Sequence, residues 1–85
     1  MPVLEITTNS QLDQILASNN QVIVDFGAQW CGPCKAAAPV YAKMSEMNRA
    51  IVFTKVDVDS CKDIAARYQV SSLPTFVLLY SLLIQ

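Results

Sequence analysis

The sequence contains no histidine, and this absence excludes more chemistry than any other feature of its composition. Without an imidazole there is no Ser-His-Asp triad, no cysteine–histidine protease pair and no histidine-ligated metal site. Charge is also scarce, because six basic and seven acidic residues leave a formal net charge of −1. A nearly neutral chain has no long-range attraction for a polyanion, so we expect no nucleic-acid partner.

Glycine and cysteine are few, with two and three residues respectively. Three cysteines are too few for a secreted disulfide scaffold. No basic stretch followed by an apolar core, the pattern of a secretory signal, stands at the N-terminus. The longest apolar run, from Phe76 to Ile84, is much shorter than the ~18 residues that suggest a membrane span. We therefore expect a soluble, cytoplasmic protein with no membrane partner.

Hydrophobic residues are abundant and make up 53% of the 85 residues. This length suits one small domain, and such a composition excludes a disordered chain. The predicted strands are apolar or β-branched runs at residues 3–6, 21–28, 51–58 and 75–80.

Three predicted helices separate these strands. The first and third begin with the S-x-x-D pattern of a capping box, at Ser10 and at Ser60. The second covers residues 33–47 and carries an apolar stripe of Val40, Met44 and Met47. The order βαβαβαβ predicts an α/β fold with a mostly parallel sheet and helices on both faces. Chemistry in such folds gathers at the carboxyl ends of the strands.

The segment Cys31-Gly32-Pro33-Cys34 lies between a predicted strand and a predicted helix. The first turn of a helix stabilises a thiolate, and Pro33 suits that turn because its missing N–H is not needed there. We expect Cys31 to lie at the helix cap and to attack a substrate disulfide. Cys34 lies one turn further in, where we expect it to be shielded and to resolve the mixed disulfide.

Two other interpretations of the C-x-x-C segment stay open. One is a disulfide that only staples a turn, and the other is half of a zinc site. The zinc interpretation lacks a second half, since Cys61 is the only other soft ligand. The position between a strand and a helix favours the redox interpretation.

Asp25 interrupts the apolar strand that leads to the C-x-x-C segment. A buried carboxylate is costly, and desolvation raises its pKa, so Asp25 is a candidate proton acceptor for Cys34. The alternative is an aspartate at a strand end that reaches water.

Three segments in order, VDFGAQWCGPCK, KVDVD and LPTF, resemble the active-site regions of thioredoxins. The resemblance runs from the N-terminus to about Tyr80. It implies the thioredoxin fold and a dithiol that reduces protein disulfides. It also implies no bound cofactor, and recharging by a thioredoxin reductase that draws on NADPH.

The resemblance also implies roles for single residues. Asp25 accepts or relays the proton of Cys34, and Lys55 is the lysine that neighbours this carboxylate, although an exposed strand lysine is an alternative. Pro74 corresponds to the cis-proline that faces the dithiol, and the backbone of Leu73 pairs with the substrate. The implied substrate-binding residues are Trp30, Leu73, Pro74 and Thr75. A core position is the alternative for Trp30.

Cys61 falls on the apolar face of the third predicted helix. We interpret it as a small buried hydrophobic residue. The alternative is a regulatory thiol, as extra cysteines are in some animal thioredoxins.

Thioredoxins continue past the Thr75–Tyr80 strand with one more strand and a last helix. We therefore predict a truncated domain over residues 1–80 and an apolar tail over residues 81–85. An exposed sheet edge and an uncovered face then predict self-association, by edge pairing or by tail exchange, and weakened activity.

Two alternative functions follow from the same features. One is an interaction or signalling protein with impaired redox activity. The other is a dimeric iron–sulfur or metal carrier in which Cys31 and Cys34 of two subunits supply four thiolates.

Overall fold

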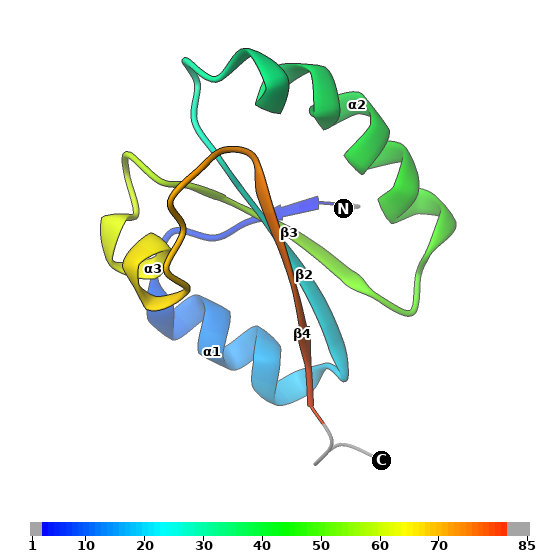
Figure 1. Cartoon of the computed structure of the whole chain (residues 1–85). Helices are drawn as coiled ribbons and strands as arrows, with labels where there is room; N and C mark the ends of the chain where they lie inside the picture. The colour runs from blue at the N-terminus through cyan, green and yellow to red at the C-terminus, as the bar shows by residue number, and fades with distance from the viewer. Residues whose placement is uncertain (1–2, 82–85) are drawn as a thin grey trace.

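The computed structural model describes residues 3–81, which form a single layer of sheet with helices on its two sides (Figure 1). The order of elements is the predicted βαβαβαβ. The elements are β1 (Val3–Glu5), α1 (Asn9–Ser18), β2 (Gln21–Gly27), α2 (Gly32–Met47), β3 (Val52–Asp57), α3 (Lys62–Arg67) and β4 (Thr75–Tyr80).

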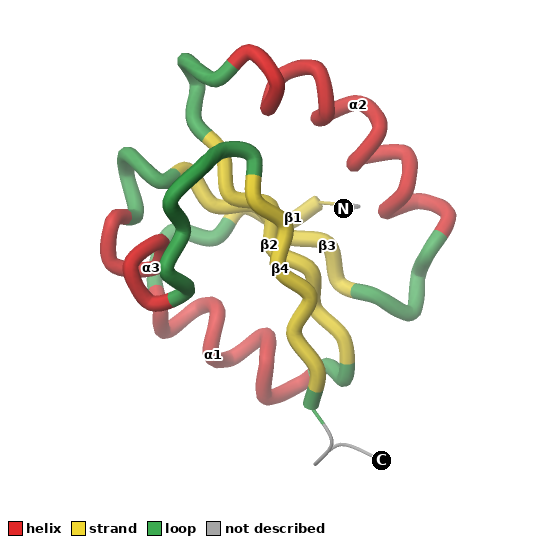
Figure 2. Tube along the Cα trace, viewed as in Figure 1, coloured by secondary structure: helices red, strands yellow, loops and turns green. Residues whose placement is uncertain are grey.

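The four strands lie in the order β1-β3-β2-β4 (Figure 2). The first three are parallel to one another, and β4 runs antiparallel to β2. The register places Asp25 of β2 opposite Lys55 of β3, and Phe26 of β2 opposite Thr75 of β4. The prediction of a mostly parallel sheet is therefore confirmed, and the start of β4 lies beside the carboxyl end of β2.

The main core lies between the sheet and the face covered by α1 and α3 (Figure 1). Alternate residues of β2 point into it, as the two-residue period of a strand requires. Its fully buried side chains include Ile6, Leu12, Val22, Val24, Phe26 and Ile64.

Helix α2 covers the other face of the sheet (Figure 1). Tyr41 is its central contact, with its ring centroid 5.1 Å from that of Phe53 and 5.6 Å from that of Phe76. The Tyr41 hydroxyl donates to the Thr54 carbonyl at 2.6 Å, and the Ile23 carbonyl lies 3.2 Å away. Burial raises the pKa of the Tyr41 hydroxyl, and the nearby Asp25 carboxylate adds to this. The hydroxyl therefore keeps its proton and ties α2 to both central strands.

The predicted apolar stripe of α2 is not its buried face. Val40, Met44 and Met47 are exposed, whereas Tyr41 and Ser45 are buried. The reason is that both buried residues satisfy their hydroxyls with main-chain carbonyls, so polarity did not keep them out of the interface.

The predicted capping residues of α1 and α3 were also wrong. Helix α1 is capped by Thr8, whose hydroxyl accepts from the N–H of Gln11 at 3.0 Å. Helix α3 begins after Cys61 without a side-chain cap. The S-x-x-D pattern occurs near both helix starts, but the residues that precede the helices are Thr8 and Cys61.

Candidate active site

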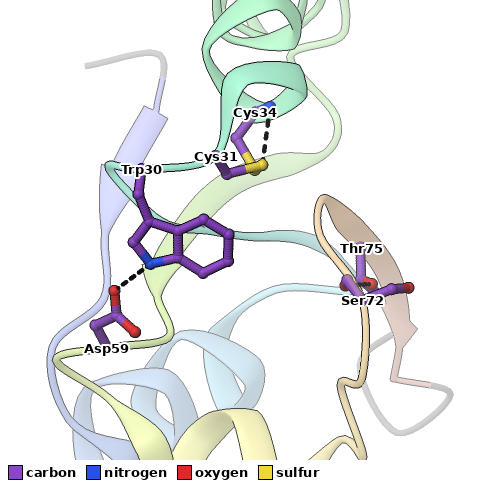
Figure 3. Close-up of a disulfide and its surroundings, with 6 residues drawn as sticks. All are labelled: Trp30, Cys31, Cys34, Asp59, Ser72 and Thr75. Atoms are coloured by element: carbon purple, nitrogen blue, oxygen red, sulfur yellow. Dashed lines mark hydrogen bonds between the residues drawn. A yellow bond between two sulfur atoms is a disulfide. The ribbon is translucent and has the colours of Figure 1, made fainter.

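The dithiol segment joins the carboxyl end of β2 to the first turn of α2. Cys31 is the N-cap residue, and its Sγ accepts from the N–H of Cys34 at 3.2 Å. Pro33 lies in the first turn, as predicted. Cys31 and Cys34 are joined by a disulfide, with 5.3 Å between their Cα atoms (Figure 3). The N–H of Cys34 therefore points at the sulfur of Cys31, which favours the thiolate when the bond opens.

The prediction that Cys34 is the shielded cysteine is not met in the disulfide form. Cys31 is only 4% exposed, whereas Cys34 is half-buried. The difference arises because Cys34 borders a cavity of about 230 Å³ that opens beside Asp25 and Lys55. The asymmetry between the two sulfurs therefore lies in their surroundings: a helix cap for Cys31 and a cavity for Cys34.

Gly27 is part of this geometry, and sequence reasoning did not select it. A Cβ atom on Gly27 would lie 3.3 Å from the Sγ of Cys34, closer than most real contacts. The last residue of β2 must therefore be small for α2 to start where it does. A glycine inside a strand marks such a close approach and was the available signal.

Asp25 lies in β2 on the α2 side of the sheet and lines the same cavity as Cys34. Its side chain is half-buried, and its Oδ1 atom is fully buried without a hydrogen-bond partner. Desolvation raises the pKa of this carboxyl, and the positive charge of Lys55 opposes that rise. Asp25 is thus a carboxyl group suited to accept a proton, separated from Cys34 by space that water can fill.

Trp30 flanks the dithiol and is 70% exposed, so the alternative of a core aromatic was wrong. Its Nε1–H donates to Oδ2 of Asp59 at 2.8 Å (Figure 3). The Asp57 carboxylate in turn accepts from the N–H groups of Asp59 and Ser60. Sequence reasoning missed Asp59, although the polar segment after β3 was a signal for a loop at this edge of the sheet.

The segment from Leu73 to Thr75 lies at the same end of the sheet. The Leu73–Pro74 peptide bond is cis, in agreement with the resemblance. Thr75 of β4 pairs with Phe26 of β2, the residue before Gly27. The Thr75 hydroxyl donates to the Ser72 carbonyl. Figure 3 shows this turn across from the disulfide. The sequence-predicted residues Trp30, Cys31, Cys34 and Thr75 therefore surround one surface region.

Cys61 lies apart from this region, at the start of α3 in the main core. It is 4% exposed, and its Sγ donates to the carbonyls of Ile6 and Thr7 at 3.7 and 3.6 Å. Burial raises the pKa of this thiol, and nearby carboxylates add to the effect. This geometry favours the interpretation of Cys61 as a buried hydrophobic residue.

Across residues 3–81, no group of three or more histidine, cysteine or acidic side chains is arranged to hold a metal ion. None of the helices in that range combines the length and apolarity of a membrane span. A second cavity, of about 410 Å³, lies between the C-terminal part of α2 and the strands β1 and β3.

Comparison with known proteins decides the family. The Thioredoxin family model matches residues 3–81, which is nearly the whole chain. The chain belongs to the thioredoxin family. Thioredoxin from Mycoplasma pneumoniae is 51% identical over 76 residues, which cover 89% of this chain and 74% of that protein. Thioredoxin from Oryctolagus cuniculus is 46% identical over 76 residues, covering 87% of this chain and 72% of its own length.

Solved thioredoxin structures share the fold. A thioredoxin from Plasmodium falciparum superimposes with a TM-score of 0.88 at 40% identity, covering 91% of this chain and 76% of its own. A poplar thioredoxin h also gives a TM-score of 0.88, at 37% identity, with coverage of 94% and 76%. The chain thus spans about three quarters of these thioredoxins. As a thioredoxin-type disulfide reductase it carries the active-site pair Cys31 and Cys34.

Proposed function

We propose that this thioredoxin reduces disulfides of other proteins with Cys31 as the attacking nucleophile and Cys34 as the resolving thiol. The observation that carries the proposal is the capped sulfur of Cys31, which accepts a main-chain N–H at the first turn of α2. A thiolate there is stabilised before any substrate binds, whereas the Cys34 sulfur has no equivalent cap.

The reaction has two exchange steps. The Cys31 thiolate attacks one sulfur of the substrate disulfide, so that the substrate bond breaks and a mixed disulfide forms. Cys34 then loses its proton and attacks the Cys31 sulfur, which releases the second substrate sulfur as a thiolate. The substrate gains two electrons and, after protonation, holds two thiols, while Cys31 and Cys34 become the disulfide that the structure contains.

We assign the proton of Cys34 to Asp25. Both groups line the cavity of about 230 Å³, which is large enough for water to carry the proton between them. The raised pKa of Asp25 suits it to accept the proton of Cys34, because a carboxylate with an ordinary pKa is a weaker base. Lys55, opposite Asp25 in the sheet, limits the rise so that the carboxyl can still release its proton.

We assign substrate binding to the surface around the disulfide. Trp30 and Thr75 border it, and the main chain of Leu73 is the candidate strand-like partner for the substrate peptide. Gly32, between the two cysteines in the sequence, is next to open space, since a Cβ there would meet no atom within 4 Å. A recognition surface of main-chain groups and one exposed aromatic ring accepts many peptide sequences.

We further propose that electrons reach the disulfide from NADPH through a thioredoxin reductase, with no cofactor bound to this chain. The working compartment is then a reducing one, and we propose the cytoplasm. Capture of the reductase on a column of the Cys34→Ser variant, or NADPH consumption with reductase and insulin, tests this partnership.

The experiment that tests the thiol roles is trapping of the mixed disulfide. With a disulfide substrate such as insulin, Cys34→Ser should accumulate a covalent complex through Cys31, because the resolving thiol is gone. Cys31→Ser should trap nothing, and Cys61→Ser should behave as wild type because that thiol is buried. Complexes through Cys34 in the Cys31→Ser variant at the wild-type rate would overturn the assignment.

The role of Asp25 needs its own measurement. Asp25→Asn should leave formation of the mixed disulfide intact and slow its resolution by ~100-fold, the lower end of general base catalysis. Glu46→Gln, which removes an exposed carboxylate at the far end of α2, is the matched control. Equal resolution rates in both variants would remove Asp25 from the mechanism.

The alternative of a redox-impaired interaction protein rests on the apolar side chains that β4 exposes on the α2 side of the sheet. Insulin reduction with dithiothreitol separates the two functions, since an inactive dithiol would favour the interaction protein.

The metal-carrier alternative predicts visible absorbance in the purified protein. The predicted tail exchange uses residues 81–85, of which residues 82–85 lie outside the described residues.

A further inference from the structure

Three charged side chains from three neighbouring parallel strands lie in one row across the sheet. The register pairs Glu5 of β1 with Lys55 of β3, and Lys55 with Asp25 of β2 (Figure 2). Residues paired across neighbouring strands direct their side chains to the same face. Ile6, the next residue after Glu5, is buried in the main core on the opposite face. The row on the α2 face is therefore a carboxylate, an ammonium group and a second carboxylate.

The same three side chains line the cavity of about 230 Å³ that Cys34 borders. Cys34 and Asp25 use this cavity in the proposed proton transfer, whereas Glu5 has no part in it so far. Glu5 is exposed at one end of the row, and Asp25 is half-buried at the other. The charge of Glu5 therefore acts on the same space as the carboxylate that accepts the proton.

Lys55 lies between the two carboxylates without being fixed to either. Its side chain is exposed, and it forms no ion pair within residues 3–81, where Arg67 and Asp13 form the ion pair that the structure shows. The flexible four-carbon stem of a lysine allows the ammonium to approach either neighbour. The closer the ammonium stays to Asp25, the more it lowers the pKa of that carboxyl.

Three other titratable side chains face Asp25 or its cavity from α2 and β3, in addition to Cys34. They are Lys35, Tyr41 and Asp57. Tyr41 keeps its proton, and the Asp57 carboxylate is held by main-chain N–H groups of the loop after β3. Strand β4 places the uncharged Phe76 opposite Asp25. The register places only Glu5 and Asp25 opposite Lys55, so these two carboxylates share its charge.

We propose that Glu5 is a positioning residue for the proton transfer from Cys34 to Asp25. Its carboxylate attracts the Lys55 ammonium toward β1 and thereby limits the charge that Lys55 places beside Asp25. Asp25 consequently stays a stronger base than it would be with Lys55 to itself. The inference rests on the proposed role of Asp25 as proton acceptor, and it adds a residue that lies outside the dithiol segment.

Removal of the Glu5 charge should lower the pKa of Asp25. In Glu5→Gln the ammonium of Lys55 is left with one carboxylate instead of two, and a nearby opposite charge favours the ionised carboxyl. We expect a fall of about half a pH unit, less than a buried opposite charge gives, because Lys55 is exposed and screened. The fold should persist, since the Glu5 carbonyl, not its carboxylate, accepts from the Gln11 side chain at 3.0 Å.

Carbon-13 NMR of the Asp25 carboxyl during a pH titration measures this shift in the oxidised protein, the form that the structure contains. Glu5→Gln should move the titration midpoint about half a pH unit lower. Glu46→Gln is the matched control, because it removes an exposed carboxylate at the far end of α2 and should leave the midpoint unchanged. An unchanged midpoint in Glu5→Gln, or an equal shift in Glu46→Gln, would overturn the inference.

Lys55→Gln tests whether Glu5 acts through the ammonium group. This variant alone should raise the Asp25 midpoint, because the charge that opposes the effect of burial is gone. Adding Glu5→Gln to Lys55→Gln should then shift the midpoint by less than half of the shift in the wild-type background. The same shift in both backgrounds would mean that Glu5 does not act through Lys55 and would overturn the inference.

The pH profile of mixed-disulfide resolution connects the row to function. Resolution should decline in acid as Asp25 takes up a proton, and Glu5→Gln should move this decline about half a pH unit lower. Resolution below the wild-type midpoint should then be about threefold faster than in the wild type. A profile that keeps its midpoint in Glu5→Gln would contradict the inference.

The Asp25→Asn variant separates this inference from the proposed function. Resolution at the wild-type rate in Asp25→Asn would remove Asp25 from the mechanism and, with it, the role of Glu5 in proton transfer. Slow resolution in Asp25→Asn, together with no shift of the Asp25 midpoint in Glu5→Gln, would overturn the role of Glu5 alone and leave the proposed function standing.

Discussion

At the scale of single residues, two residues of β2 determine the surroundings of the dithiol, one through its charge and one through its small size. Asp25 holds an unpartnered carboxylate oxygen inside the protein, and Gly27 leaves no room for a side chain against the Cys34 sulfur. Both lie in the last turn-facing part of β2, so the strand that anchors the dithiol also sets its chemical environment.

The buried carboxylate makes stability depend on pH in a definite direction. Burial raises the pKa of Asp25 in the folded state, so the native state binds this proton more tightly than the unfolded chain does. The free energy of unfolding contributed by Asp25 therefore falls as pH rises from the ordinary carboxyl pKa to the raised one, and is constant above it. Asp25→Ala should raise the free energy of unfolding at pH 7 by about 1 kcal/mol, the lower end of the cost of a buried polar group without a partner, because the Asp25 side chain is only half-buried.

Urea denaturation at several pH values measures this effect. The gain from Asp25→Ala should shrink as pH falls below the raised pKa, since the wild-type carboxyl is then neutral. Glu46→Ala, at an exposed position, should change stability little at any pH. If Asp25→Ala raises the free energy of unfolding by the same amount from acid to neutral pH, the charge of the Asp25 carboxylate is not the cause.

Sequence reasoning identified the residues near the dithiol in the chain but not those that folding brings there. Cys31, Cys34 and Asp25 stand within ten residues, and their chemistry could be argued from an apolar strand followed by a C-x-x-C turn. Asp59 is separated from Trp30 by 29 positions, and only the parallel packing of β2 and β3 brings the two side chains together. The greater burial of Cys31 could not be predicted either, because it depends on where the cavity opens.

At the scale of elements, the order of strands and helices was predictable because each strand is a compact apolar run between polar turns. The buried faces and the first residues of the helices were less predictable. The stripe of Val40, Met44 and Met47 has helical spacing, yet α2 turns Tyr41 toward the sheet because its hydroxyl finds two carbonyls there. The spacing of apolar residues predicts which of them share one face of a helix. Whether that face lies against the sheet depends on the packing of the whole domain.

The cap of α1 provides a test at this scale. Thr8→Ala removes the hydroxyl that accepts from the Gln11 N–H and should lower the free energy of unfolding by ~1 kcal/mol. Ser10→Ala, inside the helix and exposed, should leave stability unchanged or slightly higher because alanine favours helices. Thermal or urea unfolding of both variants measures the difference, and a larger loss for Ser10→Ala would restore the cap predicted from the S-x-x-D pattern.

At the scale of the whole molecule, the protein is a thin layered domain in which the disulfide closes a very short loop. Cross-linking two residues three apart restricts the unfolded chain more than the folded one. The oxidised protein should therefore exceed the reduced protein in free energy of unfolding by ~2 kcal/mol.

Urea denaturation with and without dithiothreitol measures this difference. The Cys31→Ser, Cys34→Ser double variant should show no dependence on the reductant, and Cys61→Ala should keep the full dependence because Cys61 is outside the disulfide. A reduced form as stable as the oxidised one would mean that the capped Cys31 thiolate offsets the loss of the cross-link.

The strand order has a consequence for how the protein opens. Among the strands of residues 3–81, β2 and β3 are paired on both sides, so their amide protons should exchange with solvent only when the whole domain unfolds. Amides of β1 and of α3 should exchange through smaller openings, which leave β2 in place. Because the dithiol follows β2 directly, such partial openings expose parts of the domain without disturbing the redox centre. Hydrogen exchange followed by mass spectrometry should therefore find the slowest amides adjacent to the most reactive sulfur in the molecule.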